Sequence, residues 1–198
     1  MLSMIANRAM EAELTGFEFA AGIPGTLGGA CVMNAGAYGG EMKDVLETVT
    51  VLTRDGDVKT LTKDELELGY RTSVIAKKDY IALSAVIRLE NGKKEEIKAV
   101  MDDLKEKRIT KQPLEYPSAG STFKRPEGYF AGKLIQDAGL RGFQVGGAQV
   151  SEKHCGFVVN KDQATAADVM NLMNQVSDKV YEMSGVRLEP EVKRLGVF

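Results

Sequence analysis

The chain has few of the residues that build metal sites and disulfide frameworks. Its 198 residues include two cysteines, one histidine and no tryptophan. Cys31 and Cys155 are too few and too far apart in the sequence for a disulfide framework, and together with His154 they do not suffice for a zinc site. We therefore expect no metal ion, and the scarcity of cysteine favours a reducing compartment, the cytoplasm.

Long apolar runs and a strong charge imbalance are also missing. No stretch approaches the roughly 18 apolar residues of a membrane span, and the first residues lack the basic start and apolar core of a signal peptide. The 26 basic and 28 acidic side chains give a formal charge of −2, which argues against a nucleic-acid partner. Residues 105–155 nevertheless carry nine lysines and arginines against five acidic residues, so this region could receive an anion.

The hydrophobic pattern predicts both helices and antiparallel strands. Asp55-Gly56 lies between two alternating segments and is typical of a hairpin turn, and Thr26 is a candidate cap for a helix over 27–33. The other expected elements are helices at 2–14, 93–108, 130–138 and 165–183, a short helix from Thr62, a buried strand at 80–89, and strands at 148–150, 157–159 and 186–195. Because no βαβ rhythm repeats, the fold class is α+β. The proline-rich stretch 109–128 predicts a domain boundary near its start.

One segment, "AAGIPGTLGGACVMNAGAYGG" at residues 20–40, is rich in glycine. It holds seven glycines between Gly22 and Gly40 and hardly any charge. Such a main chain can expose amides to a phosphate, and it can equally form tight turns with close helix packing. Neither the P-loop pattern nor the Rossmann pattern is present. The spacing alone leaves both interpretations open.

The longer string "GFEFAAGIPGTLGGACVMNAGAYGGEM" closely resembles the flavin-binding core of the bacterial UDP-N-acetylenolpyruvoylglucosamine reductases (MurB). The resemblance continues in order through "YRTS", "KQP", "PSAGSTFKRP", "AGKLIQDAGLRG", "GGAQVSEKHCGFVVN" and "LEPEV", and the spacing after "YRTS" is that of the subgroup without an extra tyrosine loop. It implies the second lobe of a vanillyl-alcohol-oxidase-like FAD-binding domain at 1–109 and 186–198. A smaller α+β substrate-binding domain would occupy 110–185.

The resemblance also implies which ligands the chain binds. FAD would be reduced by NADPH and would then reduce the enolpyruvyl ether of UDP-N-acetylglucosamine to UDP-N-acetylmuramate, in peptidoglycan precursor synthesis. The residues expected along FAD are Gly22, Ile23, Pro24, Gly25, Thr26, Gly28, Gly29, Asn34, Ala35 and Gly36. The glycine segment would then serve the cofactor.

Three residues match the catalytic positions of that family. Ser121 in "AGSTF" would give a proton to the carbanion, and Arg71 would stabilise the substrate carboxylate as it becomes an enolate. Glu191 in "LEPEV" would orient the substrate or donate to the enolate. Glu189 is its competitor, because alternation along a strand would place both glutamates on one face.

The residues expected on the substrate side are polar or basic, to suit a diphosphate. They are Tyr70, Lys111, Gln112, Lys124, Arg125 and His154. A structural role for His154 remains an open alternative. Arg125 departs from the family, in which asparagine follows "FK", and this puts its contact with the sugar in doubt.

A second departure is that no counterpart of the family's N-terminal lobe, with its "GxGSN"-type loop, stands in the sequence. A truncated enzyme, or one whose lobe is a separate chain, would account for this, and we expect it to retain FAD weakly. The alternatives are a flavin-free UDP-sugar-binding module and an inactive fragment. A related oxidase of the same flavin fold is a weaker alternative.

Overall fold

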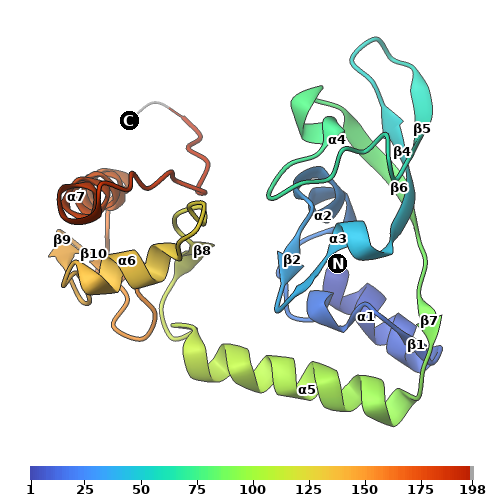
Figure 1. The fold of residues 1–198 in the computed structure, drawn as a ribbon, viewed down its shortest axis with the longest axis horizontal. Helices are drawn as coiled ribbons and strands as arrows, with labels where there is room; N and C mark the ends of the chain where they lie inside the picture. The colour runs from blue at the N-terminus through green and yellow to red at the C-terminus, as the bar shows by residue number, and fades with distance from the viewer. Residues whose placement is uncertain (197–198) are drawn as a thin grey trace. The chain divides into compact units, whose positions relative to one another are not determined.

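The structure is a computed structural model in which residues 1–196 are described. The chain forms two compact units, Met1–Arg108 and Ile109–Phe198. The boundary lies inside one continuous helix, α5 (Lys94–Lys111), whose buried side chains include Ile97 and Leu104 (Figure 1). Residues 197 and 198, which belong to the segment that we assigned to the first domain, lie outside the described residues.

The first unit is built on a three-stranded antiparallel sheet with the strand order β5-β4-β6. Strand β4 (Leu46–Leu52) lies in the centre and pairs with β5 (Val58–Thr62) and with β6 (Ile81–Ile87). The turn between β4 and β5 contains Gly56 with φ +88°, a conformation that glycine adopts without a steric cost. The hairpin predicted at Asp55-Gly56 is therefore confirmed.

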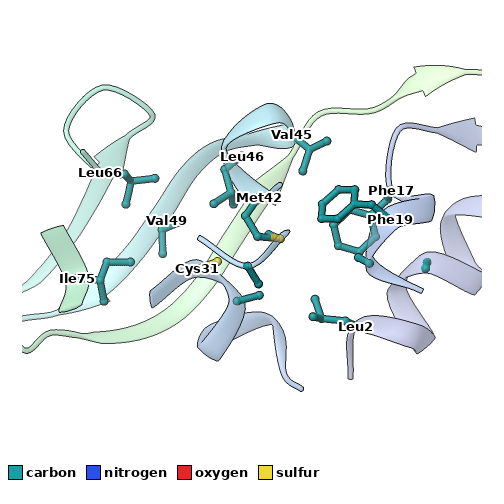
Figure 2. Close-up of a cluster of buried hydrophobic side chains, with 14 of the residues drawn as sticks. Leu2, Phe17, Phe19, Cys31, Met42, Val45, Leu46, Val49, Leu66 and Ile75 are labelled. Atoms are coloured by element: carbon teal, nitrogen blue, oxygen red, sulfur yellow. The ribbon is translucent and has the colours of Figure 1, made fainter. Parts of the chain in front are cut away.

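Short helices and two small strand pairs complete the first unit. These are α1 (Leu2–Glu11), the 3-10 helix η1 (Glu18–Ala20), α2 (Leu27–Met33), α3 (Met42–Val45), α4 (Val74–Lys77), and the pairs β1 (Leu14–Thr15) with β7 (Glu90–Asn91) and β2 (Gly36–Ala37) with β3 (Gly40–Glu41). Helix α2 packs on β6 and α4. Leu2, Phe17, Met42, Leu46 and Ile75 meet in one hydrophobic core (Figure 2).

The second unit is a four-stranded antiparallel sheet packed with two helices. The strand order is β8 (Ser118–Ser121), β11 (Phe157–Asn160), β10 (Ala148–Val150) and β9 (Gln144–Val145). The helices are α6 (Ala131–Asp137) and α7 (Ala166–Ser184), and side chains of both share a core with Val150 and Val158. Leu188, which follows α7, belongs to the same core.

Four expectations from the sequence differ from this structure. Helix α1 ends at Glu11. No helix starts after Thr62, because Glu67 has φ +45° and stops the chain after a single turn. Residues 186–195 form no strand beyond the isolated bridge of Pro190 with Phe123. Strand β6 is an edge strand rather than a buried one, and its Ile81, Leu83 and Val86 are each more than half exposed.

Among residues 1–196, no helix is both long and apolar enough to cross a bilayer.

Candidate functional site

The glycine segment, defined as residues 20–40, folds as η1, a loop, α2 and the β2–β3 hairpin. The hydroxyl oxygen of Thr26 accepts a hydrogen bond of 3.2 Å from the N–H of Gly29, so the predicted cap of α2 is confirmed. The helix ends at Asn34, which has a left-handed φ of +47°. Between Ala20 and Thr26 the main chain forms no helix or strand.

Two of the glycines are required by packing within the protein itself. A Cβ on Gly36 would lie 2.7 Å from the Cβ of Glu41, and one on Gly40 would lie 2.8 Å from the ring of Phe19. Real Cβ atoms do not approach other atoms so closely. At these two positions, tight packing explains the glycine without a ligand.

Two other glycines have a different environment. A Cβ on Gly25 would meet no protein atom within 4 Å, so packing gives no reason for glycine there. A Cβ on Gly28 would meet Ala82 at 3.8 Å, an ordinary contact. The residues around Gly25 therefore fit a main-chain cradle that a bound group, such as the flavin dinucleotide expected from the sequence, would contact directly.

Asn34 and Ala35, which we expect along the cofactor, also form hydrogen bonds within the protein. The side-chain amide of Asn34 donates to Glu41 Oε2 at 2.9 Å and to Gly69 O at 3.0 Å, while its Oδ1 accepts from the N–H of Lys43 at 2.9 Å. Ala35 is buried, and its main-chain N–H and C=O bond to other backbone groups. Both residues hold the segment in shape.

The turn that carries Tyr70 and Arg71 is attached to the end of α2. Gly69 and Thr72 close this turn with two backbone hydrogen bonds, and Arg71 has φ +55°. The turn is held by the bond from Asn34 to Gly69, and by Ser73, whose hydroxyl donates to Val32 O at 2.6 Å. Within the first unit, Arg71 is thus placed beside the glycine segment, with its guanidinium 5.2 Å from the ring centre of Tyr70.

In the second unit, Ser121 and Glu191 come from segments that run side by side. Ser121 is the exposed last residue of β8, opposite Phe157 of β11. The next residue, Thr122, accepts a hydrogen bond of 2.9 Å at its C=O from the N–H of Glu191. One bond farther along, the N–H of Lys124 donates to Glu189 O at 2.8 Å.

Glu189, the other candidate glutamate, lies on the same segment as Glu191. The carboxylate of Glu189 forms an ion pair with the ammonium group of Lys124. Lys124 and Glu189 are thus tied to each other across the ladder.

His154 has the contacts of a structural histidine. Its Nδ1 accepts a hydrogen bond of 3.0 Å from the N–H of Gly156, and its ring lies edge-on to Phe157. Burial, together with the charge of Arg141, lowers the pKa of His154 below its ordinary value. The imidazole is therefore neutral near pH 7, with a hydrogen left on Nε2 to donate.

The remaining substrate-side residues lie at exposed or partly exposed positions of the second unit. Arg125 stacks 4.0 Å from the ring centre of Phe130, and its Nε donates to Tyr129 O at 3.2 Å. Lys111 is the exposed last residue of α5, and Gln112 follows it.

A cavity that sequence analysis missed lies over the sheet of the second unit. It has a volume of about 350 Å³, and none of the predicted site residues lines it; its lining is Glu115, Tyr116, Gln149, Ser151, Glu152, Lys153, Val159 and Lys161. Two lysines and two glutamates balance each other there, so it lacks the basic surface that a diphosphate favours. No group of three or more metal-ligating His, Cys, Asp or Glu residues occurs in the described part of the chain.

Comparison with known proteins first assigns the chain to a class. Residues 6–62 match the FAD-binding-domain family, and residues 112–195 match the C-terminal domain of UDP-N-acetylenolpyruvoylglucosamine reductase. The first unit therefore has the fold of a flavin-binding domain, and the predicted α+β class is confirmed.

Whole-chain relatives then give the family. The crystal structure of the reductase MurB from Thermus caldophilus is 38% identical and has a TM-score of 0.83, and the match covers 96% of this chain and 68% of that one. The reductase of Agathobacter rectalis is 65% identical over all 198 residues, and that of Clostridioides difficile is 57% identical over 196. The chain belongs to the UDP-N-acetylenolpyruvoylglucosamine reductase family, as the resemblance implied, and it spans 63% and 64% of the lengths of these two relatives.

Proposed function

We propose that the chain is the catalytic part of a UDP-N-acetylmuramate dehydrogenase. It would reduce the enolpyruvyl ether of UDP-N-acetylglucosamine with electrons from NADPH, as a cytoplasmic step of peptidoglycan precursor synthesis that cell shape and division require. The observation that carries this proposal is the presence of an FAD-binding domain and the reductase C-terminal domain in one chain. Relatives that are 65% and 57% identical bear the reductase name.

We assign the cofactor to the first unit, and the substrate to Tyr70 and Arg71 of the first unit together with residues of the second. FAD, when bound, carries electrons from NADPH to the vinyl carbon of the substrate. The loop around Gly25 supports its placement, because the main chain there is open to a ligand. Thr26, Gly28 and Gly29, in the first turn of α2 and at its cap, continue the same surface.

Ser121 would supply the proton that completes the reduction. A serine hydroxyl is a very weak acid, but a carbanion next to a carboxylate is basic enough to take its proton at hydrogen-bond distance. The exposed end of β8 leaves this hydroxyl accessible to a ligand, and the neighbouring ladder holds Glu191 next to the same strand. Glu191 would then orient the substrate or donate to the enolate oxygen.

Arg71 would hold the substrate carboxylate. Its guanidinium keeps its charge at any physiological pH and can donate two parallel hydrogen bonds to a carboxylate. Such a fixed charge stabilises the enolate, which carries an additional negative charge, more than the carboxylate of the ground state. The left-handed φ of Arg71 supports a functional role, because a strained backbone of this kind persists at sites where the side chain must be aimed.

Charge also guides the substrate-side assignments. Lys111, Gln112 and Arg125 would contact the diphosphate and sugar, and Lys124 would do so after exchanging its partner Glu189. His154 would act as a neutral hydrogen-bond donor rather than as a cation.

Rapid-mixing kinetics on FAD-loaded protein test the proposal. In Ser121→Ala, reduction of the flavin by NADPH should proceed normally, whereas its reoxidation by the enolpyruvyl substrate should slow by about 10²- to 10⁴-fold, the usual contribution of a general acid. Ser118→Ala is the matched control, because Ser118 lies on the same strand but its hydroxyl donates a hydrogen bond to Val158 O. Equal loss of both half-reactions in Ser121→Ala would show that Ser121 is structural.

Calorimetry separates the enzyme from a flavin-free module. We expect FAD to bind and to support NADPH oxidation when the enolpyruvyl substrate is added. Binding of the UDP-sugar without any FAD binding would refute the reductase assignment and favour the module.

A further inference from the structure

One arginine of the first unit has no role in the site described so far. Arg108 lies in the last part of α5, and its side chain is partly buried. Its guanidinium lies 5.0 Å from the ring centre of Tyr38, which stands in the turn between β2 and β3. Arg108 is far from the glycine segment in sequence and next to it in space.

The guanidinium also lies directly against the main chain of Gly22. A Cβ on Gly22 would be 2.0 Å from Nη1 and 2.6 Å from Cζ of Arg108. No side chain could be placed there while the guanidinium keeps its position. Gly22 is therefore a glycine that makes room for a cation, unlike Gly36 and Gly40, which make room for packing.

Arg108 lacks the carboxylate partner that other arginines have. Arg8, Arg54, Arg88 and Arg187 each form an ion pair with an acidic side chain. Within residues 1–196, no carboxylate pairs with Arg108, although burial lowers the pKa of its guanidinium. A partly buried cation without an anion is costly unless a ligand supplies the anion.

The turn beneath Arg108 supports a built site. Tyr38 and Gly39 have φ +53° and +89°, so both central residues of the two-residue turn are left-handed. Glycine, asparagine and aspartate suit the first of these positions, and tyrosine does not. The structure accepts the strain of Tyr38, and its ring supports the guanidinium at 5.0 Å.

We propose that Arg108 is the cationic contact for a phosphate group lying on the main chain of residues 22–25, and that this phosphate belongs to the pyrophosphate of FAD. The assignment rests on the proposed flavin function. A guanidinium is a common side-chain contact for a phosphate oxygen, and Gly22 is exposed beside it. FAD is the source because residues 6–62 match an FAD-binding domain and because the main chain at Gly25 is open.

Equilibrium titrations of the 198-residue chain with FAD and with riboflavin test this assignment. Arg108→Met should weaken FAD binding by about 10- to 100-fold, the usual value of a hydrogen-bonded charge, and should leave riboflavin binding unchanged, because riboflavin has no phosphate. Raising the salt concentration should weaken FAD binding more steeply in the wild type than in the variant. Arg8→Met is the matched control, since Arg8 is an exposed arginine on α1 paired with Glu11.

A second variant tests the role of Gly22. In Gly22→Ala the new methyl group displaces the guanidinium, which is the flexible end of a side chain, so the protein should fold with an unchanged melting temperature. FAD binding should weaken as in Arg108→Met, and the double variant should bind no worse than Arg108→Met alone. Additive losses would show that Gly22 does not act through Arg108.

The outcomes are distinguishable. A wild-type chain that binds neither FAD nor riboflavin overturns the proposed function and this assignment with it. If Arg108→Met binds FAD with the same affinity as the wild type, only the role of Arg108 is overturned. If Arg108→Met loses affinity for FAD and riboflavin equally, the guanidinium contacts the flavin ring. If it loses affinity for UDP but not for FAD, the guanidinium contacts the substrate. Either result refutes the pyrophosphate contact.

Discussion

Asn34 offers the most direct test of which residues of the glycine segment serve the fold. Its side chain is 1% exposed and satisfies three groups: Glu41 Oε2, Gly69 O and the N–H of Lys43. Removing the side chain breaks these three hydrogen bonds, although Glu41 keeps its ion pair with Lys43. Asn34→Ala should therefore destabilise the first unit, even though the position resembles a cofactor contact.

The size of the effect follows from these contacts. Two neutral hydrogen bonds contribute about 1 kcal/mol each, and the bond to a carboxylate contributes about 1.5–3 kcal/mol. The left-handed φ of +47° adds about 1 kcal/mol for alanine but nothing for glycine. We expect the free energy of unfolding to fall by about 4.5–6 kcal/mol in Asn34→Ala, and by about 1 kcal/mol less in Asn34→Gly.

Urea unfolding followed by far-UV circular dichroism measures this change, because the chain has no tryptophan to report it. Asn7→Ala is the control, since Asn7 is an exposed asparagine on α1 of the same unit. A loss below about 1 kcal/mol would refute the reasoning. So would unchanged stability with weakened FAD binding, because that result would make Asn34 a direct ligand contact.

Three further changes test other parts of the structure. Gly25→Ala should leave the melting temperature unchanged but weaken FAD binding, because the added methyl group meets no protein atom. The NMR titration of His154, the one histidine, should give a pKa below 6.5, and stability should fall as the pH drops below 6.5, because the unfolded chain binds the proton first. Cys31, whose thiol pKa burial raises to about 11, should resist alkylation at neutral pH until the chain unfolds.

Each of these three results has a clear opposite. A loss of stability in Gly25→Ala would mean that the loop is packed rather than open. A pKa of His154 above 6.5 would show that burial does not lower it. The same pH dependence of stability in His154→Gln would show that His154 is not its cause. Rapid alkylation of Cys31 in the native chain would show that its thiol is accessible; Cys155, whose thiol pKa burial also raises, should likewise react slowly.

The elements that sequence predicted well are those with local signals at both ends. Helix α7 has a capping box between Thr165 and Asp168, and a left-handed Gly185 closes it. The β4–β5 hairpin has its turn signal at Asp55-Gly56. In both cases the residues that decide the structure are neighbours in sequence, so a short window contains the whole cause.

The failures come from contacts that a short window does not contain. Residues 186–195 alternate like a strand, but the structure pairs them only at the bridge of Pro190 with Phe123, a contact between segments far apart in sequence. The apolar run at 80–89 resembles a buried strand, yet β6 is the edge of its sheet. Periodicity shows which side chains are apolar and does not show what covers them.

The candidate site was predicted in a similar way. The family resemblance supplied Ser121 and Glu191, and the bond between Thr122 and Glu191 explains why segments so distant in sequence can act together. Arg108 was counted only as part of a basic region, because its proximity to Gly22 depends on the placement of α5. The roles of these residues remain predictions that the proposed variants test.

The glycine segment shows why a count of glycines is ambiguous evidence for a ligand. Gly36 and Gly40 are required by Glu41 and Phe19, whereas Gly25 faces no protein atom. Replacing each glycine by alanine separates these causes, because a packing glycine lowers stability and a ligand-facing glycine lowers affinity alone. If stability falls only at positions 36 and 40, and FAD affinity falls only at positions 22 and 25, then packing explains the first two glycines and ligand binding explains the other two.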